Sequence, residues 1–232
     1  MASLAQQHRM RVLAARGAVT QDGTRPAGGV HALMMASLLQ DMRRLKAIES
    51  VERKIAAKAQ MLPAYRDYVD GVLAADAGGA DEVITTLMVW HLDVGDFGRG
   101  LDLAAYVLRH GLTLPERYNR KVPALLLDEV ADAVLEGRAP ADEATLDALQ
   151  RVAVLTDGQD APDQARAKLH RALGETLARL AGEAPAGPKL EMARAALAQL
   201  NRAVSLNPGV GAKKAIEQLT RTIKKAEANA DG

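Results

Sequence analysis

Several features are missing from this sequence, and each absence excludes a class of protein. The chain contains no cysteine, which rules out disulfides, cysteine-based zinc sites and thiol nucleophiles. It has no run of about 18 apolar residues, and its start lacks the apolar core of a signal peptide. No glycine is followed directly by lysine, so the phosphate-binding loop of ATPases is absent as well. We therefore expect a cytoplasmic protein with no membrane partner, and not an ATP-driven motor.

Aromatic residues are also scarce, and their scarcity bears on the fold. They make up 3% of the 232 residues, whereas apolar residues as a whole reach 48%, most of them Ala, Leu and Val. This mixture favours helices that pack closely through small side chains. It disfavours sheets, which prefer β-branched and aromatic residues. The composition predicts an all-α protein built from packed helical hairpins.

The chain divides by composition into four segments. Residues 1–29 form a basic N-terminal arm that ends in the linker GAVTQDGTRPAGG. Residues 30–62 predict one long basic helix, and residues 63–182 an acidic helical core. Residues 183–232 predict a C-terminal helical hairpin that resembles a tetratricopeptide-type unit, with small Ala at the helix contact and Asn-Pro at the turn.

Single residues in the sequence predict where some of these helices begin, turn and end. The long helix is expected to run without a break from His31 to Met61, and Pro63 then ends or kinks it. Within the acidic core, Asp81 is a plausible N-cap, and the helix it begins turns back at Gly95 to form a helical hairpin. We expect the rare aromatic side chains to fill the core of this hairpin: Trp90, Phe97 and Tyr106.

The net charge of +1 conceals a strong segregation of charge along the chain. Residues 1–66 carry 11 Lys and Arg against 4 Asp and Glu, and residues 166–232 carry 12 against 6. The middle, residues 67–165, carries 7 against 19. Basic ends around an acidic middle suggest contacts with a polyanion at both ends. Chance distribution over solvated helix faces is the alternative.

Clusters of basic residues are the candidates for nucleic-acid binding. Each Lys or Arg that meets a phosphate releases counterions, which makes binding fall steeply with salt but gives no sequence specificity. No recognition helix stands out that would read base edges. The candidate DNA-binding residues are Arg9, Arg11, Arg16, Arg25, Arg43, Arg44, Lys46, Lys213, Lys214, Arg221, Lys224 and Lys225.

Candidates for catalysis are weak. Asp128, Glu129 and Asp132 are clustered acids, and the two aspartates lie four residues apart on one face of a predicted helix, as a metal-dependent nuclease would need. Acids on an amphipathic helix are more often ordinary solvated surface. The five histidines are scattered, so we expect no metal site and no cofactor, and no catalysis by the chain alone.

The order of segments resembles the GpM family, the small terminase subunits of temperate, contractile-tailed coliphages and their relatives. The resemblance covers nearly the whole chain. Its most specific part is the stretch MVWHLDVGDFGRGLDLAAYVLRHGLTLP, and other parts include QHRMRVLAA, APDQARAKLHRALG and LNRAVSLNPGVGAKKAIEQL.

This resemblance implies a role that residue chemistry alone does not supply. Small terminase subunits bind double-stranded viral DNA near the cohesive-end site and assemble into ring-like homo-oligomers. They deliver the DNA to a large subunit that carries the ATPase and nuclease, in the cytoplasm of the host bacterium. Members of the family are often labelled endonuclease subunits, a label that fits the holoenzyme. Two alternatives stay open: a metal-dependent cohesive-end endonuclease, and a helical protein-interaction adaptor without DNA binding.

Overall fold

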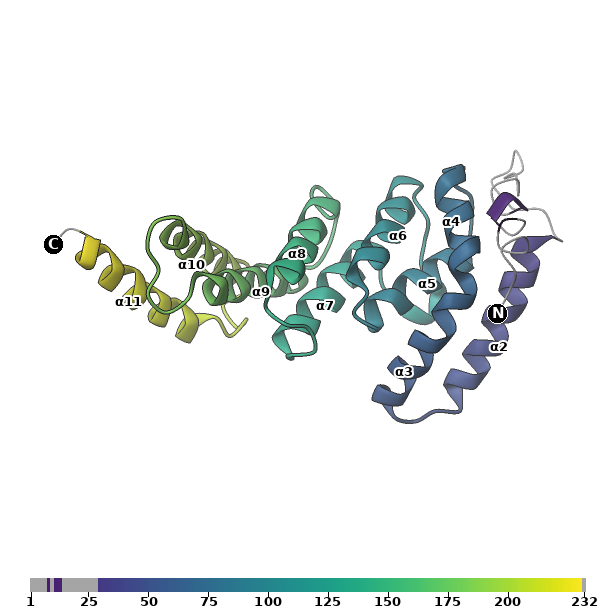
Figure 1. Cartoon of the computed structure of the whole chain (residues 1–232), viewed down its shortest axis with the longest axis horizontal. Coiled ribbons are helices and arrows are strands. Elements are labelled where there is room, and N and C mark those ends of the chain that lie inside the picture. Colours follow the sequence, from purple (N-terminus) through teal and green to yellow (C-terminus); the bar gives the residue numbers. More distant parts are fainter. Residues whose placement is uncertain (1–7, 9–10, 14–28, 231–232) are drawn as a thin grey trace. The chain divides into compact units, whose positions relative to one another are not determined.

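The computed structural model describes residue 8, residues 11–13 and residues 29–230, and every regular element among them is a helix (Figure 1). The described part contains no strand, so the all-α prediction is confirmed. The chain forms two compact units, residues 1–122 and residues 123–232. The four-segment division made from composition stays a prediction. No described helix is long and apolar enough to cross a membrane.

Unit 1 begins with two helices where the sequence predicted one. The uninterrupted helix expected over residues 31–61 is wrong: α2 spans Val30–Lys46 and α3 spans Val51–Met61. The physical reason is the cap at Ser50, whose extended backbone turns the chain and whose hydroxyl accepts a hydrogen bond from the Arg53 amide at 3.3 Å. Figure 1 shows α2 and α3 side by side and antiparallel, joined at one end by this short connection.

The end of α3 confirms the prediction made from Pro63. The α-helix stops at Met61, and the chain continues through the 3₁₀ helix η1, Leu62–Tyr65, into α4, Arg66–Ala75. This position tolerates proline, because the backbone N–H groups in the first turn of a helix have no partner within the helix. The N–H that proline lacks is therefore not needed here.

The central hairpin of unit 1 also matches the prediction. Helix α5 spans Glu82–Asp93 and α6 spans Phe97–Arg109, with a glycine of positive φ between them at Gly95. Asp81 caps α5 as expected, because its carboxylate accepts hydrogen bonds from the amides of residues 83 and 84. The three aromatic residues predicted to fill the hairpin core are buried: Trp90, Phe97 and Tyr106.

Unit 2 is a succession of helices that pack through small residues. After the 3₁₀ helix η2, Glu116–Tyr118, the helices are α7 Val122–Leu135, α8 Glu143–Leu155, α9 Asp163–Ala181, α10 Pro188–Leu206 and α11 Lys213–Ala230. Alanines dominate the core around α10, where Leu200 from α10 and Leu219 and Ile223 from α11 add the larger side chains. Helices α9 and α10 approach so closely at Gly174 that a Cβ there would meet Leu200.

The last two helices form the predicted C-terminal hairpin. The turn between α10 and α11 is held by Asn207, whose side-chain oxygen accepts a hydrogen bond from the Gly209 amide at 3.0 Å. Its likeness to a tetratricopeptide-type unit stays a prediction.

Candidate nucleic-acid interface

Helix α11 separates apolar and basic residues onto opposite faces. At about 100° per residue, its five basic residues fall within an arc of roughly 120°, and its buried residues Leu219 and Ile223 fall on the other side. We call these five residues the α11 basic arc. All are exposed, and none has a carboxylate of the described residues within ion-pair distance: Lys213, Lys214, Arg221, Lys224 and Lys225.

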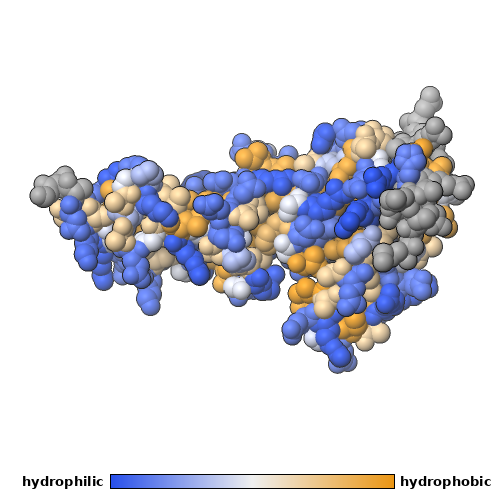
Figure 2. Space-filling view, in the orientation of Figure 1, coloured by the Kyte–Doolittle hydropathy of each residue, from blue (hydrophilic) through white to orange (hydrophobic). Residues whose placement is uncertain are grey.

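The packing of α11 explains why the arc faces solvent. The apolar side is fixed against α10 by burial of Leu219 and Ile223, so the helix cannot rotate without exposing them. In the face shown in Figure 2, hydrophilic side chains project outward over α10 and α11. Among the described residues of α11, the one acidic residue within the arc is Glu217, and it is exposed. Such an arrangement presents several positive charges to one extended polyanion.

The basic residues of α2 lie beside the connection to α3. Arg43 and Lys46 are exposed, whereas Arg44 donates to Asp41 at 3.0 Å and is thereby partly neutralised. Because the chain reverses at residues 47–50, Arg53 and Lys54 at the start of α3 return to the same end of the hairpin. These two residues were not among the predicted DNA-binding residues. In one continuous helix, Arg53 would lie about 15 Å beyond Arg43.

Two other basic positions fit an interface less well. Lys58 on α3 donates to Asp93 at 2.5 Å and is mostly buried, so it holds α3 to α5. Arg11 from the N-terminal arm pairs with Asp67 of α4 at 3.0 Å. The other arm candidates, Arg9, Arg16 and Arg25, lie outside the described residues.

The candidate catalytic acids are joined by a lysine. Asp128 and Asp132 share one face of α7, as predicted, but Lys168 of α9 donates to both, at 3.0 and 2.9 Å. Burial lowers the pKa of Lys168, but hydrogen bonds and attraction from the two carboxylates outweigh burial and leave it raised. A cation therefore occupies the place that a metal would take between them. Glu129 is half-buried on the same helix. The described residues contain no group of three side chains able to hold a metal ion.

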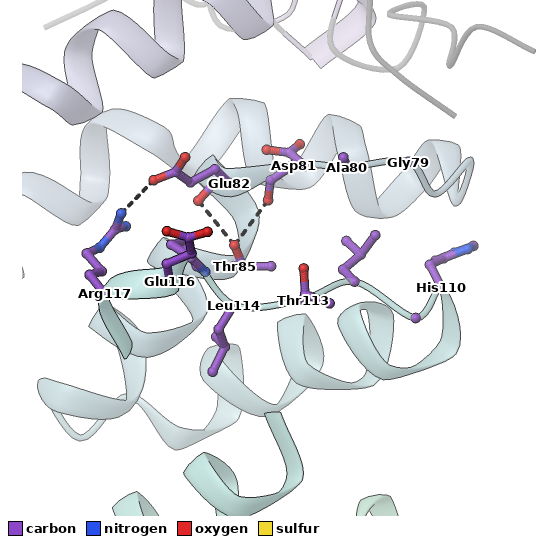
Figure 3. Close-up of a pocket in the computed structure, with 13 residues that line it drawn as sticks. Gly79, Ala80, Asp81, Glu82, Thr85, His110, Thr113, Leu114, Glu116 and Arg117 are labelled. Atoms are coloured by element: carbon purple, nitrogen blue, oxygen red, sulfur yellow. Dashed lines mark hydrogen bonds and ion pairs between the residues drawn. The ribbon is translucent and has the colours of Figure 1, made fainter. Parts of the chain in front are cut away.

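A cavity with a volume of about 870 Å³ lies at the start of α5 (Figure 3). Several of its polar side chains are engaged by other groups of the protein. Arg117 donates to Glu82 at 2.6 Å and to the Thr86 hydroxyl at 2.5 Å, and the Thr85 hydroxyl donates to backbone carbonyls. Asp81 accepts two backbone amides and the hydroxyl of Tyr68. The cavity wall thus joins the α5 cap to the segment after α6, and it offers no activated nucleophile.

A histidine at the edge of this cavity is also committed to structure. His110 bonds Asp76 through Nε2 at 2.8 Å, and Arg109 bonds the other oxygen of that carboxylate at 2.8 Å. The hydrogen bond with His110 and the charge of Arg109 hold the pKa of Asp76 below its ordinary value. These bonds tie the end of α4 to the end of α6.

Comparison with known proteins supplies the family. The sequence model described as the phage small terminase subunit matches residues 35–164. This chain belongs to the phage small terminase subunit family, and the resemblance noted in the sequence is confirmed. It acts in phage DNA packaging, where the family works with a large subunit and viral DNA.

A curated relative extends the match over almost the whole chain. The "Terminase, endonuclease subunit" of Escherichia phage P2 is 39% identical over 224 residues, which cover 97% of this chain and 87% of that protein. No solved structure matches the chain.

Proposed function

We propose that this chain binds double-stranded viral DNA at or near the cohesive-end site and assembles into a homo-oligomeric ring. It then hands the DNA to the large ATPase and nuclease subunit for cutting and packaging into procapsids in the host cytoplasm. The observation that carries the DNA-binding part is the α11 basic arc, with five exposed cations on a helix whose opposite side is fixed by packing.

The dimensions of the arc suit a DNA backbone. From Lys213 to Lys225 the helix rises about 18 Å, a length over which duplex DNA presents roughly ten phosphate charges. If all five cations met phosphates, the arc alone would contribute about 4.5 to the slope of log affinity against log salt. Binding through the arc is therefore strongly salt-dependent and only weakly sequence-dependent, and base-edge contacts or DNA bending would have to add the preference for the cohesive-end site.

The test is fluorescence-anisotropy binding to a cohesive-end duplex and a scrambled duplex across a salt series. We expect tighter binding to the cohesive-end duplex and a steep loss of affinity with salt. The double variant Lys213→Ala with Lys224→Ala should reduce the salt slope by about 1.8. Gln218→Ala, an exposed and uncharged position on the same helix, is the matched control and should leave the slope unchanged. Absence of binding to either duplex at low salt would refute the proposal and favour a protein adaptor.

The basic end of the α2–α3 hairpin is the second proposed DNA contact. Arg43→Ala with Arg44→Ala should weaken binding and flatten the salt slope, and Arg43 should account for most of the change because Asp41 already engages Arg44. Arg53→Ala extends the test to the residue that the chain reversal brings to this end. An unchanged slope in both variants would remove the hairpin end from the DNA site.

The name of the phage P2 relative motivates a second candidate, an intrinsic metal-dependent endonuclease. The aspartates bridged by Lys168 are the acids that would have to carry it, and the lysine between them stands against it. The test incubates the chain with divalent metal and a cohesive-end plasmid in the absence of the large subunit. Reproducible nicking that is lost in Asp128→Asn or Asp132→Asn would establish the endonuclease, and no nicking would leave cutting to the large subunit.

A further inference from the structure

A groove runs along α11 on the side that faces α9. Its deeper part has a volume of about 620 Å³, with α9 on one wall, α11 on the other and Leu200 of α10 at its floor. A second hollow of about 190 Å³ continues it towards the end of α11. Glu183 and Thr222 line both, so the two hollows are adjoining parts of one groove. From Ala215 to Asn229 the groove follows about 21 Å of helix, close to four turns.

Small side chains keep the groove open. Ala178 and Gly182 contribute the α9 wall, and Ala215 and Thr222 contribute the α11 wall. Alanines and a proline line the continuation: Ala184, Pro185, Ala186 and Ala226. Walls of this kind leave room for the larger apolar side chains of another helix, which would insert at the i, i+4 and i+7 spacing.

The groove lining carries two bases and two acids, and the neighbouring α11 basic arc makes the surroundings mainly positive. Arg179 lines the α9 wall and Lys225 the continuation along α11, and neither has a carboxylate of the described residues within ion-pair distance. The α11 basic arc borders the groove on its outer side. Of the two acids in the lining, Glu175 is engaged by Arg171 at 2.7 Å, so Glu183 is the acid that remains to oppose these cations. An occupant with acidic residues along its flank is therefore favoured over a basic one.

We propose that this groove docks an amphipathic α-helix of the terminase large subunit, with apolar residues on one face and acidic residues on its flank. The inference rests on the proposed partnership with the large subunit and adds the surface and the chemistry of the contact. The apolar face of the docked helix lies over the partly exposed Ala178 and Ala215, and its acidic flank meets Arg179. DNA and the large subunit thus use adjoining sides of α11, which places the DNA next to the subunit that receives it.

The test measures binding of the purified large subunit of the same phage, with DNA binding measured on the same protein samples. Ala215→Trp fills the groove and should weaken large-subunit binding by at least about tenfold while DNA affinity stays within about twofold. Ala198→Trp, on the exposed face of α10, is the matched control and should change neither. Conversely, Lys213→Ala with Lys224→Ala should weaken DNA binding and spare the large subunit. Equal effects of the two tryptophan variants, or none from Ala215→Trp, would overturn the proposal.

An exposed position provides a test that does not endanger folding. Gln218 lines the groove and is exposed, so Gln218→Glu should weaken large-subunit binding at low salt and Gln218→Lys should strengthen it. If Gln218→Glu strengthened binding and Gln218→Lys weakened it, the proposed acidic flank of the docked helix would be refuted. Because the chain has no cysteine, a photo-crosslinker attached to Gln218→Cys reports on this one site. Crosslinks to an amphipathic acidic segment of the large subunit support the proposal, whereas crosslinks only to DNA or to a second copy refute it.

The same measurements separate this inference from the DNA-binding proposal. If the wild-type protein binds the cohesive-end duplex but not the large subunit, the groove inference fails and DNA binding stands. If it binds the large subunit through the groove but no duplex, the DNA-binding proposal fails alone.

Discussion

The contact between α9 and α10 allows a sharp test of the packing that supports both proposed surfaces of unit 2. A Cβ added at Gly174 would lie 2.6 Å from Cγ of Leu200, 2.8 Å from its Cδ2 and 3.0 Å from the carbonyl oxygen of Ala196. Leu200 is fully buried and Ala196 offers backbone, so neither neighbour can yield without separating the two helices. We therefore expect Gly174→Ala to move α9 away from α10.

The magnitude follows from two opposing effects. Overpacking of a core costs about 1–3 kcal/mol, and the backbone neighbour places this site at the upper end. Replacing glycine by alanine inside a helix raises the free energy of unfolding by about 1 kcal/mol. The free energy of unfolding should thus fall by about 2 kcal/mol, measured by urea denaturation followed by far-ultraviolet circular dichroism.

A second helical glycine supplies the control. A Cβ at Gly98 in α6 would meet nothing within 4 Å, so Gly98→Ala should be neutral or stabilise by up to about 1 kcal/mol. In the double variant Gly174→Ala with Leu200→Ala, the loss should be smaller than the sum of the single losses, because the two closest atoms, both of Leu200, are gone. Equal stability of the Gly174→Ala and Gly98→Ala variants would refute this reasoning.

Three further predictions concern polar contacts. Lys168→Met leaves two aspartates of α7 without their shared cation. It should lower the free energy of unfolding by only about 0.5 kcal/mol, because the lysine side chain is 38% exposed. Urea denaturation at low and high salt measures this loss. Asp81→Ala removes a helix cap and leaves the buried Tyr68 hydroxyl without this acceptor, so it should cost about 2–4 kcal/mol in the same assay. Burial lowers the pKa of His91 despite hydrogen bonding and attraction from Asp96. The stabilising effect of neutral His91 is therefore complete above about pH 6.5 and is lost as the pH falls through the lowered pKa. Urea denaturation from pH 8 to pH 5 should show a weaker acid dependence in His91→Gln than in the wild type.

The acids of α7 show how a local pattern can be right while its interpretation changes. Their spacing correctly placed Asp128 and Asp132 on one face, because helical periodicity alone decides that. The lysine that bridges them comes from α9, 36 and 40 residues further along the chain. No local pattern reports such a pairing, which depends on how α9 packs against α7.

Much of the architecture was already determined by the sequence. The excess of Ala and Leu and the lack of aromatic residues favoured helices, and short-range signals such as Asp81, Gly95 and Pro63 marked where elements begin, turn and end. These signals act within a few residues, through capping hydrogen bonds and allowed backbone angles, so they can be read without knowing the partners in space.

The tertiary structure decided how α2 and α3 pack on either side of the break at Ser50, the closeness of Gly174 to Leu200, and which cations stay exposed. Residues 31–61 have the periodicity of one helix, and only the reversal of the chain lets both α2 and α3 pack against α5. Lys58 and the cations of the α11 basic arc look alike in sequence, yet one is bound to Asp93 and the others face solvent. The physical reason is that ion pairing and burial depend on residues distant in the chain, which packing alone brings together.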